Sequence, residues 1–398
     1  MACQGGGSLG AYHIGALKAM EEAEYWPGIL AGISIGAFTA AIIAGSEPKE
    51  RLKKLEAFWE KISWSDLPDI PGARTYLDQW YKLFDPLHLM PSTCLTDYLL
   101  DPKRWHNLMS SMQGFVWGQP HFFGPRFPPP QLHASGTTGA TSFYDTTSLR
   151  ATLEELVDFE RINAGNQGRL ILGVTHVKSG DLRFFKSGED KPLGPDHVMA
   201  SGAMPPGFPG VRIDGELYWD GGCASNTPLD GIYDEARGKD TLCCVVDLFG
   251  PSGREPQDLG EVMLTQKEIQ YSSRIKDHIR LVNQRHILAH HLHKTSAGKS
   301  KSLMRHLEKA QVPRPAARHR FDIVHVLYDK PDSEEPTCDC EFSTASIRAR
   351  AAHGYEDLKK ALAENARLNK RAGPALKAIS SVTRTFKGGR CVESSLEA

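Results

Sequence analysis

The chain has 398 residues, of which 40% are hydrophobic and 24% charged, and its formal net charge at pH 7 is −1. This composition is ordinary for a globular enzyme, and without a window of 18 apolar residues it excludes a transmembrane helix. The N-terminus lacks the basic and apolar regions of a signal peptide, and the eight cysteines form no Cys-x-x-Cys pair. We therefore expect a cytoplasmic protein with reduced thiols.

The first 45 residues predict a strand, a helix, a second strand and a second helix. Only four residues precede the glycine-rich GGGSLG (5–10), which leads into the helical pattern AYHIGALKAMEEA. The apolar ILAGIS (29–34) is typical of a buried strand and runs directly into IGAFTAAIIAG, typical of a helix packed on a sheet. This βαβα order predicts an α/β fold with a mostly parallel sheet, although the first strand is very short and could position the glycines poorly.

An amphipathic helix is predicted at 49–62, and a lid-like irregular segment follows at 65–145. The run GFVWGQPHFFGPRFPPP (114–130) contains too many prolines for regular structure. Its apolar side chains could contact acyl chains or a bilayer, or could pack on the core. They are Phe115, Val116, Trp117, Phe122, Phe123 and Phe127.

Alternating helix and strand patterns continue from 145 to 249. We expect a helix at 145–159, a β-hairpin made of 169–177 and 181–185, and a short helix at 197–203. Strands are then expected at 216–222, which enters a tight turn, and at 242–249.

We divide the chain into a catalytic domain, 1–250, and a mainly helical C-terminal region, 251–398. The C-terminal region is expected to hold one core strand near 321–328, a last helix at 343–371 and a frayed tail. Residues 1–250 carry 21 basic and 30 acidic side chains, whereas 251–398 carry 26 and 18. The most basic part, 285–320, could contact an anionic membrane or form a solvated loop, and we expect no nucleic-acid partner.

The glycines of GGGSLG also match the G-x-G-x-x-G pattern of dinucleotide-binding loops. That interpretation requires an acidic residue at the end of the second strand, where this chain has Gly32-Ile33-Ser34. Backbone N–H groups of glycines at a helix N-terminus can bind other anions, including the oxyanion of a tetrahedral intermediate.

GISIG (32–36) has the form G-x-S-x-G, which places a serine on a sharp turn between a strand and a helix. Ser34 would need a base, but none of the sixteen histidines lies in a strong catalytic motif. His286 and His290 are spaced for metal binding but lack a clear third ligand, so we expect no metal.

The stretch YWDGGCASNTPL (218–229) offers another base. Asp220 ends a predicted strand and is followed by Gly221 and Gly222. An Asp-Gly-Gly sequence is usually only a turn, but its carboxylate can act as a base if it lies within reach of the serine hydroxyl.

Together the three motifs, with HVMASGAMPP (197–206), resemble the patatin-like phospholipases. The resemblance implies a three-layer α/β/α domain and a Ser–Asp dyad that hydrolyses lipid esters through an acyl-enzyme, without a cofactor. It assigns the nucleophile to Ser34 and the base to Asp220. It assigns the oxyanion loop to Gly5, Gly6 and Gly7. The remaining glycines of the motifs are Gly10, Gly32, Gly36, Gly221 and Gly222.

Two other functions stay open at this point. The protein could be a catalytically impaired lipid- or polymer-binding member of this fold, or, with less support, a nucleotide-binding protein. The sequence does not indicate the head group, the chain length or the oligomeric state.

Overall fold

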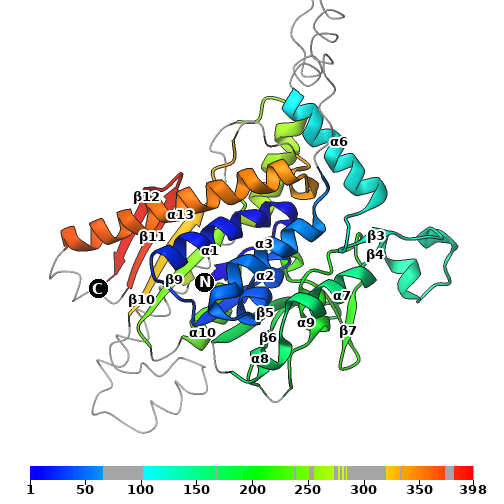
Figure 1. The fold of residues 1–398 in the computed structure, drawn as a ribbon, viewed down its shortest axis with the longest axis horizontal. Coiled ribbons are helices and arrows are strands. Elements are labelled where there is room, and N and C mark those ends of the chain that lie inside the picture. Colours follow the sequence, from blue (N-terminus) through cyan, green and yellow to red (C-terminus); the bar gives the residue numbers. More distant parts are fainter. Residues whose placement is uncertain are drawn as a thin grey trace, which may run out of the picture.

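The computed structural model describes the chain as a mixed sheet between two layers of helices (Figure 1). The described residues are 1–65, 102–165, 168–189, 191–236, 239–250, 255–272, 277, 280–281, 284, 320–331, 334, 336–372 and 381–397. The basic stretch predicted at 285–320, except its last residue, and the histidines His286 and His290 lie outside these residues.

The central sheet has ten strands in the order β12-β11-β10-β9-β1-β2-β5-β8-β7, with β6 paired to β5. From β11 through β5 in this order, every neighbouring pair is parallel, whereas β12, β6, β8 and β7 make antiparallel pairs. The strands are β1 Ala2–Cys3, β2 Ile29–Gly32, β5 Arg169–His176, β6 Leu182–Lys186, β7 Val211–Ile213, β8 Glu216–Asp220, β9 Thr241–Asp247, β10 Phe321–Leu327, β11 Ser381–Lys387 and β12 Arg390–Glu397. A separate small sheet pairs β3 Gly124–Pro125 with β4 Tyr144–Asp145.

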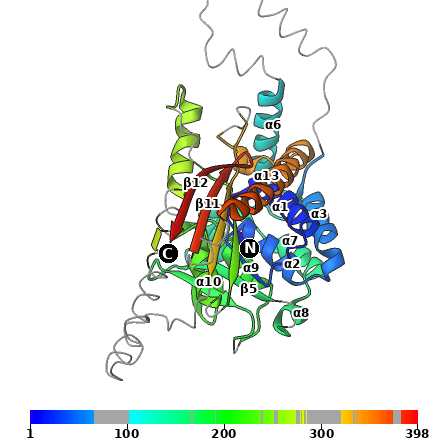
Figure 2. The same ribbon diagram turned by 90° about the vertical axis from the view of Figure 1, so that its left-hand side faces the viewer.

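Alternate residues of the buried strands face two different helical layers, as the two-residue period of a strand requires. Cys3, Leu30 and Val246 pack in the larger core under α1, α2, α3 and α13, whereas Ala2, Ala31 and Val245 pack against α10. Figure 2 shows the sheet edge-on, with α1, α3 and α13 together on one side. The helices are α1 Tyr12–Glu22, α2 Ile35–Ala44, α3 Arg51–Ile62, α6 Pro102–Trp117, α7 Thr147–Leu156, α8 Phe159–Asn163, α9 Pro195–Ser201, α10 Leu229–Glu235 and α13 Thr344–Ala372.

Short 3₁₀ turns connect several of these elements, and residues 259–272 form a further helix. The 3₁₀ turns are η1 Gly7–Ala11, η2 Pro48–Glu50, η3 Pro130–Leu132, η4 Thr138–Thr141, η5 Gly221–Cys223 and η6 Cys338–Cys340. Within the described ranges, no helix combines the length and the apolar character needed to cross a membrane.

The predicted α/β architecture is confirmed. The opening strand–helix–strand–helix order is β1, α1, β2 and α2, and the predicted hairpin is the antiparallel pair of β5 and β6. The strands expected at 216–222, 242–249 and 321–328 correspond to β8, β9 and β10, and the last predicted helix is α13.

The prediction of a frayed tail is wrong. Residues 381–397 form the hairpin of β11 and β12, and β11 pairs in parallel with β10. Gly388 and Gly389 both have positive φ, as a tight two-residue hairpin turn requires. Chain ends are poorly ordered only when nothing ties them down, and here the sheet does so.

The prediction of an irregular segment over 65–145 is wrong for residues 102–117, which form α6. Pro102 is the first residue of this helix, where its missing N–H is not needed, and the dense prolines begin only after Trp117. From 118 to 143 the chain contains 3₁₀ turns and the two-residue strand β3, and residues 66–101 lie outside the described part.

Candidate active site

Ser34 occupies a strained turn between β2 and α2. Its backbone has φ 56° and ψ −129°, a conformation that non-glycine residues rarely adopt. A Cβ at Gly32 would collide with the carbonyl of Gly36, and a Cβ at Gly36 would collide with the carbonyl of Cys3. The two glycines therefore allow the turn to be this tight, which leaves the Ser34 side chain at the start of α2.

Asp220 is the last residue of β8 and is completely buried. Its Oδ1 accepts a hydrogen bond of 2.7 Å from the N–H of Gly222, and its Oδ2 has no hydrogen-bond partner among the described residues. Burial raises the pKa of Asp220 to about 7, even though the Ser34 hydroxyl and the Gly222 N–H favour the ionised form. This carboxyl group can therefore exchange a proton near neutral pH.

The register of the sheet brings Ser34 and Asp220 together. β6 occupies one edge of β5, so β2 and β8 share the other edge. β2 is parallel to β5 and ends with Gly32 opposite Leu172, whereas β8 is antiparallel and ends with Asp220 opposite Val174. The carboxyl ends of β2 and β8 therefore meet head-on, and the next residues along each chain face one another.

The short helix α9 supports this meeting point. The Ser34 N–H donates to the Ser201 carbonyl at 3.0 Å, and the Ser201 hydroxyl donates to the carbonyl of Gly173 at 2.6 Å. The N–H of Asp220 donates to the carbonyl of Ala203 at 3.0 Å. Ser201 and Ala203 belong to HVMASGAMPP, so this motif supports both candidate catalytic residues.

The glycine-rich loop passes beside Ser34. A Cβ on Gly5 would lie 2.9 Å from the Cβ of Ser34, and the Gly5 carbonyl accepts a hydrogen bond of 3.0 Å from the Asn226 side chain. The loop is preceded by β1, which pairs with both β2 and β9. The two residues of β1 are therefore enough to place the start of the loop in the middle of the sheet. The Gln4 side-chain oxygen accepts hydrogen bonds from the backbone of Leu248 and Phe249, at 2.6 and 3.1 Å, and fixes the start of the loop.

Gly10, Gly221 and Gly222 allow close packing around the same site. A Cβ on Gly10 would lie 2.6 Å from the Ile35 side chain at the start of α2. A Cβ on Gly221 would lie 2.6 Å from the carbonyl of Gly173 on β5. The structure thus brings all ten predicted site residues into one region at the carboxyl ends of the strands.

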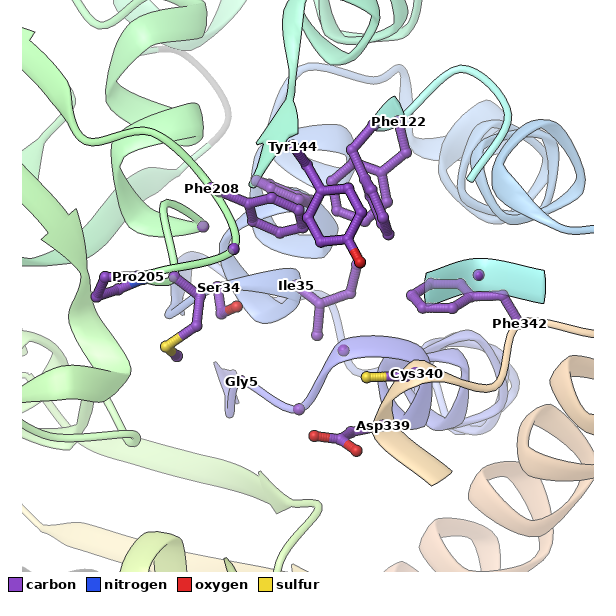
Figure 3. A pocket seen from close by; sticks show the side chains of 18 of the residues that line it. Gly5, Ser34, Ile35, Phe122, Tyr144, Pro205, Phe208, Asp339, Cys340 and Phe342 are labelled. Atoms are coloured by element: carbon purple, nitrogen blue, oxygen red, sulfur yellow. The ribbon is translucent and has the colours of Figure 1, made fainter. Parts of the chain in front are cut away.

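A cavity of about 340 Å³ opens beside Ser34 and the loop Gly5–Gly7 (Figure 3). Its volume lies in the range of small-molecule sites, and its walls are mostly apolar. The main apolar side chains are Ile35, Phe38, Phe122, Phe123, Phe208 and Phe342. None of the cavity-lining residues, all from the described part of the chain, is a histidine.

The aromatic residues of the predicted lid have different positions. Phe122 is 5% exposed and packs edge-on against Phe38, and it lines the cavity with Phe115 and Phe123. Trp117 and Phe127, by contrast, are 68% and 91% exposed. Phe122 therefore packs on the core and at the same time forms part of the cavity wall.

Sequence reasoning missed several residues of the site. Asn226 lies in the quoted YWDGGCASNTPL, six residues after Asp220, and its polar side chain in a glycine-rich turn was an available signal. Tyr144, Asp339, Cys340 and Phe342 also line the cavity, but they come from distant parts of the chain and no local pattern marks them.

Comparison with known proteins identifies the family. The family described as Patatin-like phospholipase matches residues 1–233, more than half of the chain, and a second family described as Patatin phospholipase matches 269–373. The chain therefore belongs to the patatin-like phospholipases, a family of lipid hydrolases, and its sheet and helical layers have the fold expected of it.

One similar solved structure is that of VipD from Legionella pneumophila, which is 18% identical in sequence with a TM-score of 0.36. The alignment covers 91% of this chain but only 66% of VipD. Among curated proteins, none matches this sequence.

Proposed function

We propose that this protein is a serine lipid acyl hydrolase of the phospholipase A type. The observation that carries the proposal is that Ser34 lines an apolar cavity and lies beside the buried carboxyl group of Asp220, whose pKa is about 7. A serine needs a base, and Asp220 is a carboxyl group whose pKa the Ser34 hydroxyl lowers by hydrogen bonding. The absence of histidine from the described cavity lining supports a Ser–Asp dyad over a triad.

The proposed reaction begins when Asp220 takes the proton of the Ser34 hydroxyl and the serine oxygen attacks the ester carbonyl carbon. Backbone N–H groups of the loop Gly5–Gly7 stabilise the negative charge on the former carbonyl oxygen. Collapse of the tetrahedral intermediate breaks the ester bond, and Asp220 returns the proton to the leaving alcohol. The product of this half-reaction is an acyl-enzyme on Ser34.

Water then completes the cycle. Asp220 takes a proton from a water molecule, which attacks the acyl carbonyl and forms a second tetrahedral intermediate in the same loop. Its collapse returns the proton to the Ser34 oxygen and releases the fatty acid. A base with a pKa of about 7 suits both steps, because it is partly ionised at neutral pH and still accepts a proton far better than an ordinary aspartate.

The shape of the cavity supports a lipid substrate. The phenyl rings of Phe122, Phe123 and Phe208 stand together over one side of it, with ring centroids 4.9 to 5.7 Å apart. Such a wall can take an acyl chain out of water, which is favourable by about 0.8 kcal/mol for each buried methylene group. The reacting carbonyl would then lie at Ser34.

We place this activity in the cytoplasm, with transient contact to an anionic membrane surface. The sequence 285–320 has nine Lys and Arg and a single acid, Glu308. Flotation of the protein with anionic and zwitterionic vesicles at low salt tests the contact, and equal recovery with both vesicle types would contradict it.

The decisive experiment compares hydrolysis of a short-chain p-nitrophenyl ester by the wild type, Ser34→Ala and Asp220→Asn. We expect turnover by the wild type and background rates for both variants. The matched controls Ser63→Ala and Asp181→Asn, away from the cavity, should keep full activity. A fluorophosphonate probe should label Ser34 in the wild type.

Other outcomes support the other functions. An inert wild type that still binds lipid or polymer would favour a binding protein, and nucleotide retained through purification would favour a nucleotide-binding protein. Turnover that survives in Ser34→Ala would overturn the proposed nucleophile.

A further inference from the structure

The wall of the cavity that faces the glycine-rich loop comes from the C-terminal part of the chain. Asp339, Cys340 and Phe342 line the cavity on this side (Figure 3). Gly7 lies directly against this segment, because a Cβ on Gly7 would collide with the Asp339 carbonyl oxygen. The candidate oxyanion loop is thus packed between Ser34 and a segment more than 300 residues further along the chain.

Ser8, which follows the loop directly, is tied to the same segment. Its side chain is completely buried, and its hydroxyl donates a hydrogen bond of 2.5 Å to the carbonyl of Cys338. The Ser8 hydroxyl oxygen in turn accepts a hydrogen bond of 2.8 Å from Nη1 of Arg350, on α13. Ser8 is therefore held on two sides by the C-terminal region.

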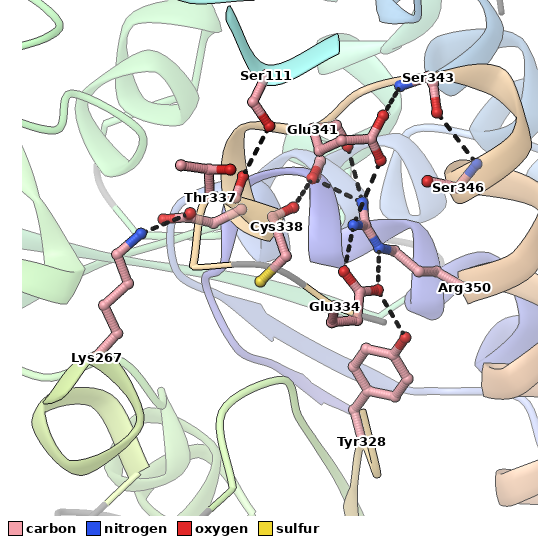
Figure 4. Close-up of polar contacts among 12 residues, drawn as sticks. Ser111, Lys267, Tyr328, Glu334, Thr337, Cys338, Glu341, Ser343, Ser346 and Arg350 are labelled. Atoms are coloured by element: carbon pink, nitrogen blue, oxygen red, sulfur yellow. Dashed lines mark hydrogen bonds and ion pairs between the residues drawn. The ribbon is translucent and has the colours of Figure 1, made fainter. Parts of the chain in front are cut away.

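Arg350 uses its whole guanidinium group within this cluster (Figure 4). Nε and Nη2 donate to the two carboxylate oxygens of Glu334 at 2.9 and 2.8 Å, and Nη1 donates to the Glu341 carbonyl at 2.9 Å as well as to Ser8. Nη2 also faces the Glu341 carboxylate at 3.6 Å. The side chain of Arg350 is 1% exposed, so these contacts are rigid and shielded from water.

Three further contacts hold the segment that carries Asp339. The Lys267 ammonium pairs with Asp339 at 2.7 Å and donates to the Pro336 carbonyl at 2.9 Å. The Ser111 hydroxyl, on α6, donates to the carbonyl of Thr337 at 3.4 Å (Figure 4). The segment is therefore a fixed support rather than a loose cover, and Arg350 joins this support to the loop.

We infer that Arg350 is a positioning residue for the oxyanion loop and acts on Gly5–Gly7 through Ser8. The inference rests on the proposed function, because it assumes that the loop stabilises an oxyanion. It adds that the C-terminal region, through Glu334 and residues 336–350, is part of the catalytic unit. Arginine suits this place because its planar guanidinium group supplies five donors in a fixed fork, whereas lysine supplies a compact point charge.

The expected effect is on turnover rather than on substrate binding. Loop N–H groups displaced by a fraction of an ångström stabilise the transition state less while the apolar cavity still holds the acyl chain. We expect Ser8→Ala and Arg350→Lys each to lower kcat about 10- to 100-fold, less than the loss of a whole oxyanion donor, with KM changed less than about twofold.

A double-mutant cycle tests whether the two residues act through one contact. The combined Ser8→Ala/Arg350→Lys variant should have a kcat no lower than that of the poorer single variant. Arg384→Lys is the matched control, because Arg384 is also buried but bonds Asn365 and Asn369, and β11 is separated from β1 by β9 and β10. Arg384→Lys should shift the urea midpoint of unfolding without a change in kcat. When it is combined with Ser8→Ala, the kcat should equal that of Ser8→Ala alone.

The outcomes separate this inference from the proposed function. If the wild type is active and depends on Ser34 and Asp220, but folded Ser8→Ala keeps its full kcat, the inference is wrong and the proposed function stands. The inference is also wrong if the fold-losses of kcat in Ser8→Ala and Arg350→Lys multiply in the double variant. Should Arg350→Lys fail to fold, Ser8→Ala alone still decides, and an inert wild type overturns both proposals.

Discussion

Replacing Asp220 by Asn should stabilise the protein at neutral and alkaline pH while it removes the proposed base. Burial raises the pKa of Asp220 from 3.8 to about 7, against smaller opposing effects of Ser34 and Gly222. The folded protein therefore binds this proton more tightly than the unfolded chain. The stability contributed by the protonated form is fully present below pH ~4 and is lost as the pH rises through about 7.

The size of the effect follows from the same difference. Each pKa unit corresponds to about 1.4 kcal/mol, so a rise of about three units makes the ionised carboxylate destabilising by about 4 kcal/mol. Asparagine keeps an oxygen to accept the Gly222 hydrogen bond and carries no charge. The free energy of unfolding of Asp220→Asn should thus exceed that of the wild type by about 1 kcal/mol at pH 4.5 and by about 4 kcal/mol at pH 8.

Equilibrium urea denaturation at pH 4.5, 6 and 8, with a reductant present, measures this difference. The neighbouring groups do not interfere, because burial raises the pKa of the Cys223 thiol to about 11 and that of the Tyr271 hydroxyl above its usual value. Asp181→Asn, at an exposed turn away from the cavity, is the control for the same substitution elsewhere in the chain. A difference between Asp220→Asn and the wild type that stays flat with pH would refute the reasoning.

Three further predictions concern the same site. The kcat/KM of the wild type for a neutral ester should rise with pH to a plateau, with a midpoint near 7 set by Asp220, and a midpoint near 4 would contradict its burial. Gly36→Ala should abolish activity and folded yield, because its Cβ collides with the Cys3 carbonyl, whereas Gly28→Ala, with open space around it, should express and fold like the wild type. Phe122→Ala should lower the free energy of unfolding by about 3–5 kcal/mol in urea denaturation, and a loss under 1 kcal/mol would mean that the ring is not part of the core.

Ser34 and Asp220 could be predicted because local sequence patterns mark each of them. Glycines at 32 and 36 around Ser34 indicate a turn that no other residue type allows, and the small apolar helix after them indicates close packing on a sheet. Asp220 was marked by its position between a strand pattern and two glycines. What the sequence could not show is the register of β2 and β8 along β5, which is the feature that turns two separate motifs into one site.

The C-terminal region was harder to predict because its role depends on contacts across long sequence distances. Arg350 and Ser8 are 342 positions apart, and each belongs to a stretch that by itself indicates only a helix or a turn. The hairpin of β11 and β12 did carry a local signal, in the Gly388-Gly389 pair between two alternating segments. Its position near the end of the chain outweighed that signal in the prediction.

The boundary predicted at residue 250 therefore separates two stretches of sequence more clearly than two units of structure. β9, before the boundary, pairs along its whole length with β10, after it, so that one sheet continues through both. The same continuity places α13 beside α1, where the backbones approach so closely that a Cβ on Gly354 would collide with the Tyr12 carbonyl. α1 follows the glycine-rich loop and α13 carries Arg350, so the contact between these two helices lies beside the support that we infer for the loop. If the inference about Arg350 holds, the proposed oxyanion site depends on the C-terminal region as well as on the motifs at the start of the chain.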